Sequence, residues 1–141
     1  MSEASIHPQP LLISVAVSTR WGDMDAFHHV NNSVYSTYLE EARLQWFRTF
    51  DGPWASAESG PVIAALTINY RKPVEWPTEL LIELYAGKVG RSSIVIPFRM
   101  LDRGDNKIVY AEGDTVLVWT SPKLGTSIPL PDYVRRALNV A

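Results

Sequence analysis

Apolar and polar positions alternate along much of the chain, which is the pattern of half-buried β-strands. In residues 12–20, Ile13, Val15 and Val17 alternate with small residues. Four more strand-like segments lie between residues 62 and 120, separated by glycine, proline and charged residues. They cover residues 62–71, 79–89, 92–101 and 107–120. The last three are joined by short turns, so we expect them to form an antiparallel meander.

One segment has the period of a helix instead. Between residues 32 and 50, apolar side chains recur at helical spacing, as Tyr35, Leu39, Ala42, Trp46 and Phe50. This spacing predicts a buried amphipathic helix of about four to five turns. Asn31 or Asn32 is expected to cap its start, and Asp51-Gly52-Pro53 to end it.

The order of these elements is strand, long helix, then four strands, without the βαβ alternation of doubly wound folds. It predicts an α+β domain over residues 11–141, in which one long sheet curls around the helix. Residues 1–10 are expected to be a loose tail, and residues 132–138 a short helix. Pro97 and Gly113 fall inside strand segments, so we expect an edge position or a bulge at each.

The composition fits one soluble globular domain, with 46% hydrophobic and 20% charged residues in 141. A net charge of -2 argues against coating of nucleic acid. The chain has no cysteine, which excludes disulfides, thiolate zinc sites and a cysteine nucleophile. No apolar run approaches the roughly 18 residues that span a bilayer. We therefore expect a cytoplasmic protein without a membrane span.

Side chains capable of acid–base chemistry gather just before the predicted helix. Asp23 and Asp25 lie in a loop next to the helix N-terminus, whose free amides can stabilise an oxyanion. A carboxylate there can activate water or attack an acyl carbon, so acyl transfer or hydrolysis fits these residues. Alternatively, the aspartates and asparagines only cap turns and the helix. On the helix itself, Glu40 and Arg43 are expected to form an ion pair.

The same region carries a longer motif. It reads Arg-Trp-Gly-Asp-Met-Asp at residues 20–25, His-Val-Asn-Asn at 29–32 and Tyr-Leu-Glu-Glu-Ala-Arg at 38–43. Weaker matches follow in the same order, at residues 68–74, 89–93 and 116–119. This pattern resembles the 4-hydroxybenzoyl-CoA thioesterase family of hotdog-fold proteins. The resemblance implies a long central helix wrapped by a five-stranded antiparallel sheet, and a homodimer or homotetramer with active sites between subunits.

The resemblance also implies a catalytic site. Asp25 corresponds to the catalytic carboxylate, as general base or nucleophile, and Asn32 to the residue whose backbone amide donates to the oxyanion. His29 either orients Asp25 or the substrate, or bonds only to backbone. Asp23 is expected to stabilise the turn and pair with Arg20. His28 stands where the family usually has glycine, so either it narrows the pocket or it points to solvent.

Coenzyme A carries phosphates, and several basic and hydroxyl side chains could bind them. The candidates are Arg91, Ser92, Ser93, Lys88, Arg71 and Lys72. Their alternative role is that of ordinary solvated charges at strand ends.

Together these features predict an acyl-CoA thioesterase that releases a free acid and coenzyme A. Coenzyme A is then part of the substrate, and neither a separate cofactor nor a metal is expected. Two alternatives stay open, a non-catalytic module that binds acyl thioesters and a thioesterase acting on acyl-carrier protein. No nucleic-acid partner is expected.

Overall fold

The computed structural model describes residues 7–139. Six elements appear in the predicted order, β1 (Leu11–Ser18), α1 (Val34–Phe47), β2 (Gly60–Tyr70), β3 (Glu79–Tyr85), β4 (Ser93–Asp102) and β5 (Val109–Ser121). A one-turn 3-10 helix (Trp21–Asp23) precedes α1. A two-residue strand β6 (Thr126–Ser127) and a short helix α2 (Asp132–Ala137) follow β5.

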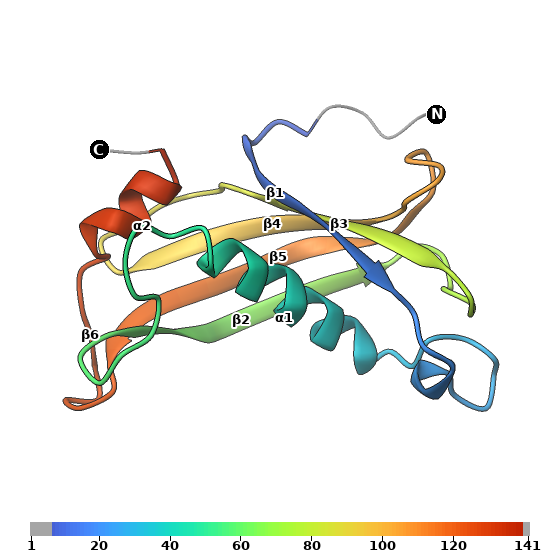
Figure 1. The fold of residues 1–141 in the computed structure, drawn as a ribbon, viewed down its shortest axis with the longest axis horizontal. Coiled ribbons are helices and arrows are strands. Elements are labelled where there is room, and N and C mark those ends of the chain that lie inside the picture. Colours follow the sequence, from blue (N-terminus) through green and yellow to red (C-terminus); the bar gives the residue numbers. More distant parts are fainter. Residues whose placement is uncertain (1–6, 140–141) are drawn as a thin grey trace.

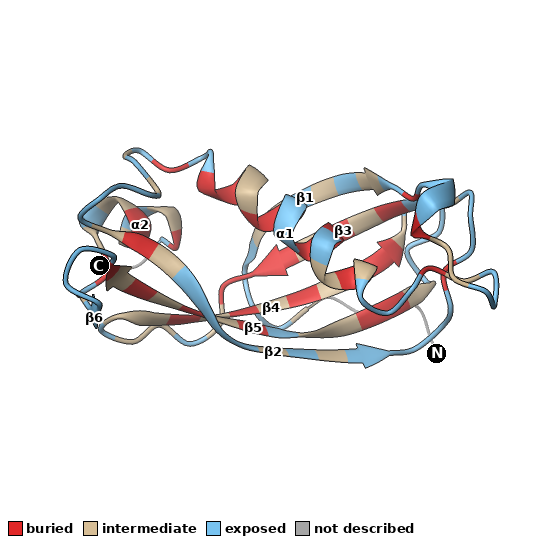
Figure 2. Ribbon diagram, turned by 90° about the horizontal axis from the view of Figure 1, so that it is seen from below, coloured by how far each residue is buried: buried red, intermediate tan, exposed pale blue. Residues whose placement is uncertain are grey.

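The strands form a single antiparallel sheet in the order β1-β3-β4-β5-β2, with β6 beside β5. The expected meander is β3-β4-β5. In Figure 1, α1 crosses one face of the sheet, and Figure 2 shows the sheet curving beneath the helix. This arrangement confirms the predicted α+β class and the hotdog fold, with β6 as a small addition. Neither helix in the described chain is long and apolar enough to cross a membrane.

The core lies between α1 and the face of the sheet that the helix covers. Strand β3 contributes Leu80, Ile82 and Leu84, all almost fully buried, while the residues between them face the other way. From the helix, Leu39, Ala42 and Trp46 point into the same core, as the helical spacing in the sequence predicts. Burying each large side chain contributes about 2 kcal/mol, so this packing fixes α1 against the sheet.

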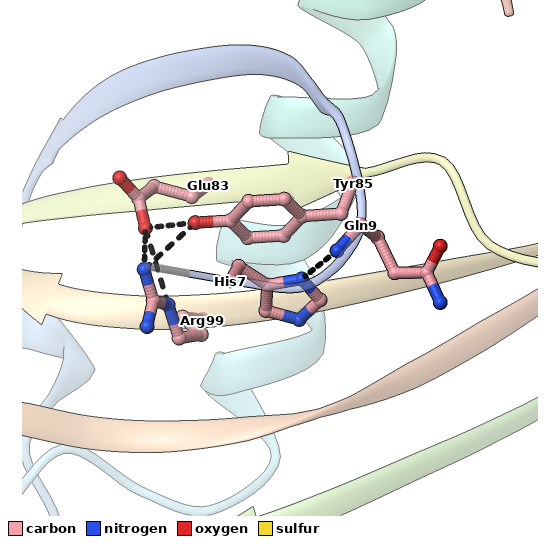
Figure 3. A network of polar contacts seen from close by, with 5 residues as sticks. All are labelled: His7, Gln9, Glu83, Tyr85 and Arg99. Carbon is pink, nitrogen blue, oxygen red and sulfur yellow. Dashed lines mark hydrogen bonds and ion pairs between the residues drawn. The ribbon is translucent and has the colours of Figure 1, made fainter. Parts of the chain in front are cut away.

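The outer face of the sheet carries a polar network shown in Figure 3. Arg99 of β4 donates to the Glu83 carboxylate at 3.0 Å and to the Tyr85 hydroxyl at 2.9 Å. The His7 ring stacks on Tyr85, with 3.7 Å between ring centroids. Ala86 also donates its N–H to the carbonyl of Pro10 at 2.9 Å. Residues 7–10 are therefore held against the sheet, whereas residues 1–6 of the expected tail lie outside the described residues.

Of the two possibilities expected at Pro97 and Gly113, an edge position or a bulge, the bulge forms at neither residue. Both pair regularly, Pro97 with Asp114 and Gly113 with Phe98 as well as with Ile68 of β2. Proline has no N–H to donate, and it fits here because the β3–β4 ladder ends at the neighbouring pair, Leu84 with Phe98. At Gly113 a Cβ would lie 1.9 Å from the carbonyl oxygen of Thr67. Glycine here allows β2 to approach β5.

Strand β2 is an edge of the sheet and is unusually open. Figure 2 shows much of it as exposed, along its length and on both faces. Val62 and Ile63 are each 48% exposed, although both are large and apolar. An uncovered apolar edge strand offers backbone groups and side chains to another strand.

Candidate active site

The loop between β1 and α1 is anchored by Asp23, which ends the 3-10 helix and is only 3% exposed. Arg20 donates to its Oδ1 through Nη2 at 3.0 Å, and the Tyr38 hydroxyl donates to its Oδ2 at 2.6 Å. Burial alone would raise the pKa of Asp23, but these hydrogen bonds outweigh it and hold that pKa below its usual value. Burial and the neighbouring carboxylate raise the pKa of Tyr38. The predicted Arg20–Asp23 pair and structural role of Asp23 are confirmed.

Asp25 is two residues further on and has a different environment. Its Oδ1 accepts one hydrogen bond, from the N–H of Phe27 at 2.8 Å, which forms a tight turn. Its backbone N–H donates to the carbonyl of His29 at 2.9 Å, so the backbone fixes its position. Within the described chain no other group donates to this carboxylate. The Asp25 side chain is partly exposed and keeps lone pairs available for a ligand.

The start of α1 agrees in part with the predicted cap. The helix begins at Val34, and Ser33, at its N-cap position, makes no side-chain cap hydrogen bond. Asn31 makes a bond of the predicted kind two residues earlier, where its Oδ1 accepts from the backbone N–H of Ser33 at 2.9 Å and from its hydroxyl at 2.8 Å. In residues 7–139, the N–H of Asn32 has no hydrogen-bond acceptor. It is an unused donor next to the helix N-terminus.

The two histidines of the loop have different positions. The His29 ring lies beside Glu75, with 4.0 Å between Nε2 and Oε2. In the described chain the ring makes no hydrogen bond to the Asp25 carboxylate, and the two residues are joined only by the backbone bond from the Asp25 N–H to the His29 carbonyl. His28 is exposed and has φ of 62°, the left-handed conformation that glycine adopts without strain. Of the two possibilities for His28, the structure supports the one in which it points to solvent.

A cavity of about 490 Å³ brings the predicted catalytic residues together. Asp25, His29 and Asn32 all line it. Two tyrosines form its wall beside them, Tyr35 of α1 and Tyr70 of β2, with ring centroids 4.9 Å apart and nearly perpendicular planes. Tyr70 also donates its hydroxyl to the Asn32 carbonyl at 3.4 Å. The helical spacing of Tyr35 predicts a core position and gives no sign of its place at the cavity. Tyr70 lies within the motif at residues 68–74 but was not among the predicted site residues.

The six candidates for binding coenzyme A fall into two groups. Arg71 and Lys72 line the cavity, and Arg71 Nε also donates to Glu112 Oε2 at 2.7 Å. The other four lie near the opposite end of the sheet, at Lys88 and at Arg91, Ser92 and Ser93. From Ser93 to Met100, which lies near the cavity end, β4 extends roughly 23 Å. Within one chain, this second group and the cavity do not meet.

Arg43 departs from its predicted role. It is 5% exposed, and its Nη1 is fully buried without a hydrogen-bond partner in the described chain. The expected ion pair with Glu40 is not formed there. The two residues differ in burial, because Glu40 is exposed whereas Arg43 is buried, although both line one small cavity beside the start of β2.

Comparisons with known proteins agree with this architecture. The profile of the thioesterase-like superfamily matches residues 19–138. A proposed thioesterase of Pseudomonas aeruginosa, PA2801, is 42% identical and superposes with a TM-score of 0.86, over 91% of this chain and 98% of its own. A proposed acyl-CoA thioesterase of Xanthomonas campestris, XC229, is also 42% identical, with a TM-score of 0.73 over 77% and 92% of the two chains.

A shorter match comes from a curated relative. The long-chain acyl-CoA thioesterase FadM of Escherichia coli is 36% identical over 59 residues, which are 40% of this chain and 45% of FadM. The fold and the site define a hotdog protein with a carboxylate beside a helix N-terminus. This chain belongs to the thioesterase-like superfamily. The predicted family is thereby confirmed, and the likenesses support thioester hydrolysis as its chemistry.

Proposed function

We propose that the protein is an acyl-CoA thioesterase in which Asp25 is the catalytic carboxylate. The observation that carries the proposal is the cavity that both Asp25 and Asn32 line. Asp25 accepts only one hydrogen bond in the described chain, and the Asn32 N–H has no acceptor there. A base and an unused donor at a helix start are what the hydrolysis of a thioester requires.

In the proposed reaction, the thioester carbonyl oxygen accepts a hydrogen bond from the Asn32 N–H. Asp25 takes a proton from a water molecule as the water oxygen attacks the carbonyl carbon, or attacks that carbon itself. The C–S bond then breaks, and the sulfur leaves as a thiolate that gains a proton. If Asp25 is the nucleophile, a mixed anhydride forms, and water hydrolyses it to release the acid and restore the Asp25 carboxylate. Thiolate is a good leaving group, so the mechanism uses neither a metal nor a further cofactor. The His29 ring and the Tyr70 hydroxyl shape the cavity around the acyl carbon.

We also propose that two copies pair antiparallel through β2, as a dimer or a dimer of dimers. The exposed apolar edge of β2 supports this pairing. A two-fold axis near the middle of β2 would turn the Arg91 end of one copy toward the cavity end of the other. Lys88, Arg91, Ser92 and Ser93 could then join Arg71 and Lys72 of the partner copy around one coenzyme A. Sedimentation should give two or four times 15.8 kDa, and a fully active monomer would contradict the pairing.

The direct test compares the wild type with Asp25→Asn in an assay of thiol release from short, long and aromatic acyl-CoAs. The chain has no cysteine, so a thiol reagent reports only the coenzyme A released. We expect Asp25→Asn to fold normally by circular dichroism and to lose about 10²–10⁴-fold in kcat. A folded variant with full activity rules out this role for Asp25. Saturable acyl-CoA binding by the wild type without thiol release would instead favour a binding module.

A further inference from the structure

A second, smaller cavity lies between α1 and the start of β2. Its volume is about 220 Å³, and its walls are mainly apolar, from Leu44, Phe47, Trp54, Ile63 and Leu117. Phe47 and Trp54 stack there with 5.3 Å between their ring centroids. The cavity is below the usual 300–1,000 Å³ of sites for larger ligands, so it suits a short segment of a molecule.

Two charged residues line this cavity, Arg43 and Glu40. Glu40 is exposed to solvent, whereas the guanidinium of Arg43 is buried, and the two form no ion pair in the described chain. Arginine stays charged in proteins and has five N–H donors, so it needs acceptors when it is removed from water. Burial lowers the pKa of Arg43 and the charge of Glu40 only partly opposes this. Nη1 has no acceptor in the described chain. An apolar cavity with a buried, unsatisfied guanidinium has the features of a site for a carboxylate attached to a hydrocarbon.

The location of this cavity relates it to the active site. It adjoins Pro61, Val62 and Ile63, near the start of β2, whereas the active-site cavity adjoins Tyr70 at the end of the same strand. Both cavities also contact α1, the smaller one at the middle of the helix and the active-site cavity at its start. In an antiparallel β2 pair centred on the middle of the strand, the start of one copy lies beside the end of the other. The Arg43 cavity of one copy then continues the active-site cavity of its partner.

We propose that Arg43 binds a carboxylate at the far end of the acyl group whose thioester lies in the active site of the partner copy, so that the enzyme prefers ω-carboxyacyl thioesters. This inference rests on the proposed function and on the proposed β2 pairing. The phosphates of coenzyme A do not suit this cavity, because they lie on the other side of the thioester from the acyl group. The apolar walls would contact the methylene chain, and the guanidinium would bind its terminal oxygens in bidentate geometry.

The experiment measures binding, so it does not depend on turnover. Two thioethers that cannot be hydrolysed, S-(4-carboxybutyl)-CoA and S-pentyl-CoA, have five acyl-side carbons each and differ in the carboxylate. Their dissociation constants are measured by calorimetry with the wild type, Arg43→Met and Arg48→Met. Arg48 is an exposed arginine just after the same helix and hydrogen-bonds only Gln45 through its side chain, so its variant controls for loss of one positive charge.

The wild type should bind the carboxylate analogue about 10- to 100-fold more tightly than the pentyl analogue. Arg43→Met should abolish that preference while leaving the affinity for S-pentyl-CoA and the sedimentation mass unchanged, and Arg48→Met should keep the preference. A wild type that binds both analogues equally, or the pentyl one better, overturns the inference without any variant. If Arg43→Met sediments as a monomer, the inference is also overturned, because the guanidinium then finds its acceptor on the second copy of the chain and not on the acyl group.

Failure of the two proposals can be told apart. If the wild type shows the carboxylate preference but releases no thiol from any acyl-CoA, the Arg43 site stands and the hydrolase assignment fails. If thiol release is normal and the preference is absent, the thioesterase stands and the Arg43 inference fails.

Discussion

Removing one hydroxyl from Tyr38 tests how the active-site loop is held. In Tyr38→Phe, the buried Asp23 carboxylate loses its 2.6 Å hydrogen bond but keeps those from Arg20, including the Arg20 backbone N–H to Oδ2 at 3.0 Å. A hydrogen bond to a charged group contributes about 1.5–3 kcal/mol, and no buried donor is left unsatisfied by the change. We therefore expect Tyr38→Phe to lower the free energy of unfolding by about 2 kcal/mol at pH 7.

The same variant has a predictable dependence on pH. The folded-state pKa of Asp23 lies below the unfolded value near 3.8. The stability contributed by this carboxylate is therefore complete above the unfolded pKa and is lost as the pH falls through the folded pKa. Without Tyr38, the folded-state pKa rises toward its ordinary value. The difference between wild type and variant should be largest at pH 5–7 and shrink below pH 4.

Urea denaturation at several pH values, followed by circular dichroism, measures this difference. Tyr133→Phe is the matched control, because the Tyr133 hydroxyl donates to the neutral carbonyl of Pro53 at 2.6 Å. Its cost should be about 1 kcal/mol and independent of pH. The reasoning is refuted if Tyr38→Phe changes stability by less than about 0.5 kcal/mol at pH 7, or if its cost stays constant through acidification.

Two further predictions concern His28 and His7. His28 has φ of 62° and does not line the active-site cavity. In urea denaturation His28→Gly should therefore be about 1 kcal/mol more stable than His28→Ala, with thiol release unchanged in both variants. Equal stabilities of the two variants would contradict backbone strain at this position. Burial and the charge of Arg99 lower the pKa of His7 below 6.5. The stability that its packing on Tyr85 contributes is therefore complete above pH 6.5 and is lost as the pH falls through the folded-state pKa. Titration of the His7 ring by NMR should give a midpoint below 6.5 that rises in Tyr85→Leu, and an unchanged midpoint would argue against burial as the cause.

Local sequence patterns predicted the elements and located the loop that carries Asp25, because both depend on neighbours in the sequence. The helical spacing of Leu39, Ala42 and Trp46 gave α1 its buried face, and the motif around Asp25 and Asn32 located the loop beside it. The helix start was predicted only in part, because Asn31 accepts from the Ser33 N–H as expected, but the helix begins at Val34, later than either asparagine indicates.

Features that depend on distant segments could not be predicted in the same way. Gly113 indicated an irregular strand, but glycine is required there because the backbone of Thr67, 46 positions earlier in the chain, leaves no room for a Cβ. Arg43 fitted an intrahelical pair with Glu40 by spacing, yet it is buried and lines a cavity beside the start of β2. Both outcomes depend on how β2 crosses the helix and meets β5. The spacing of residues within one element carries no information about that packing.

Asp23 and Asp25 show how the same side chain takes two roles within three residues. At Asp23, Arg20 and Tyr38 occupy both oxygens and burial excludes water, so the charge is permanently compensated. At Asp25, one backbone N–H holds Oδ1, and in the described chain the remaining lone pairs have no donor. A carboxylate acts as base or nucleophile only with a lone pair that its surroundings have not already used. The partners of the two carboxylates, rather than their position in the Asp-x-Asp motif, therefore make Asp25 the candidate for the proposed catalytic role and give Asp23 a structural one.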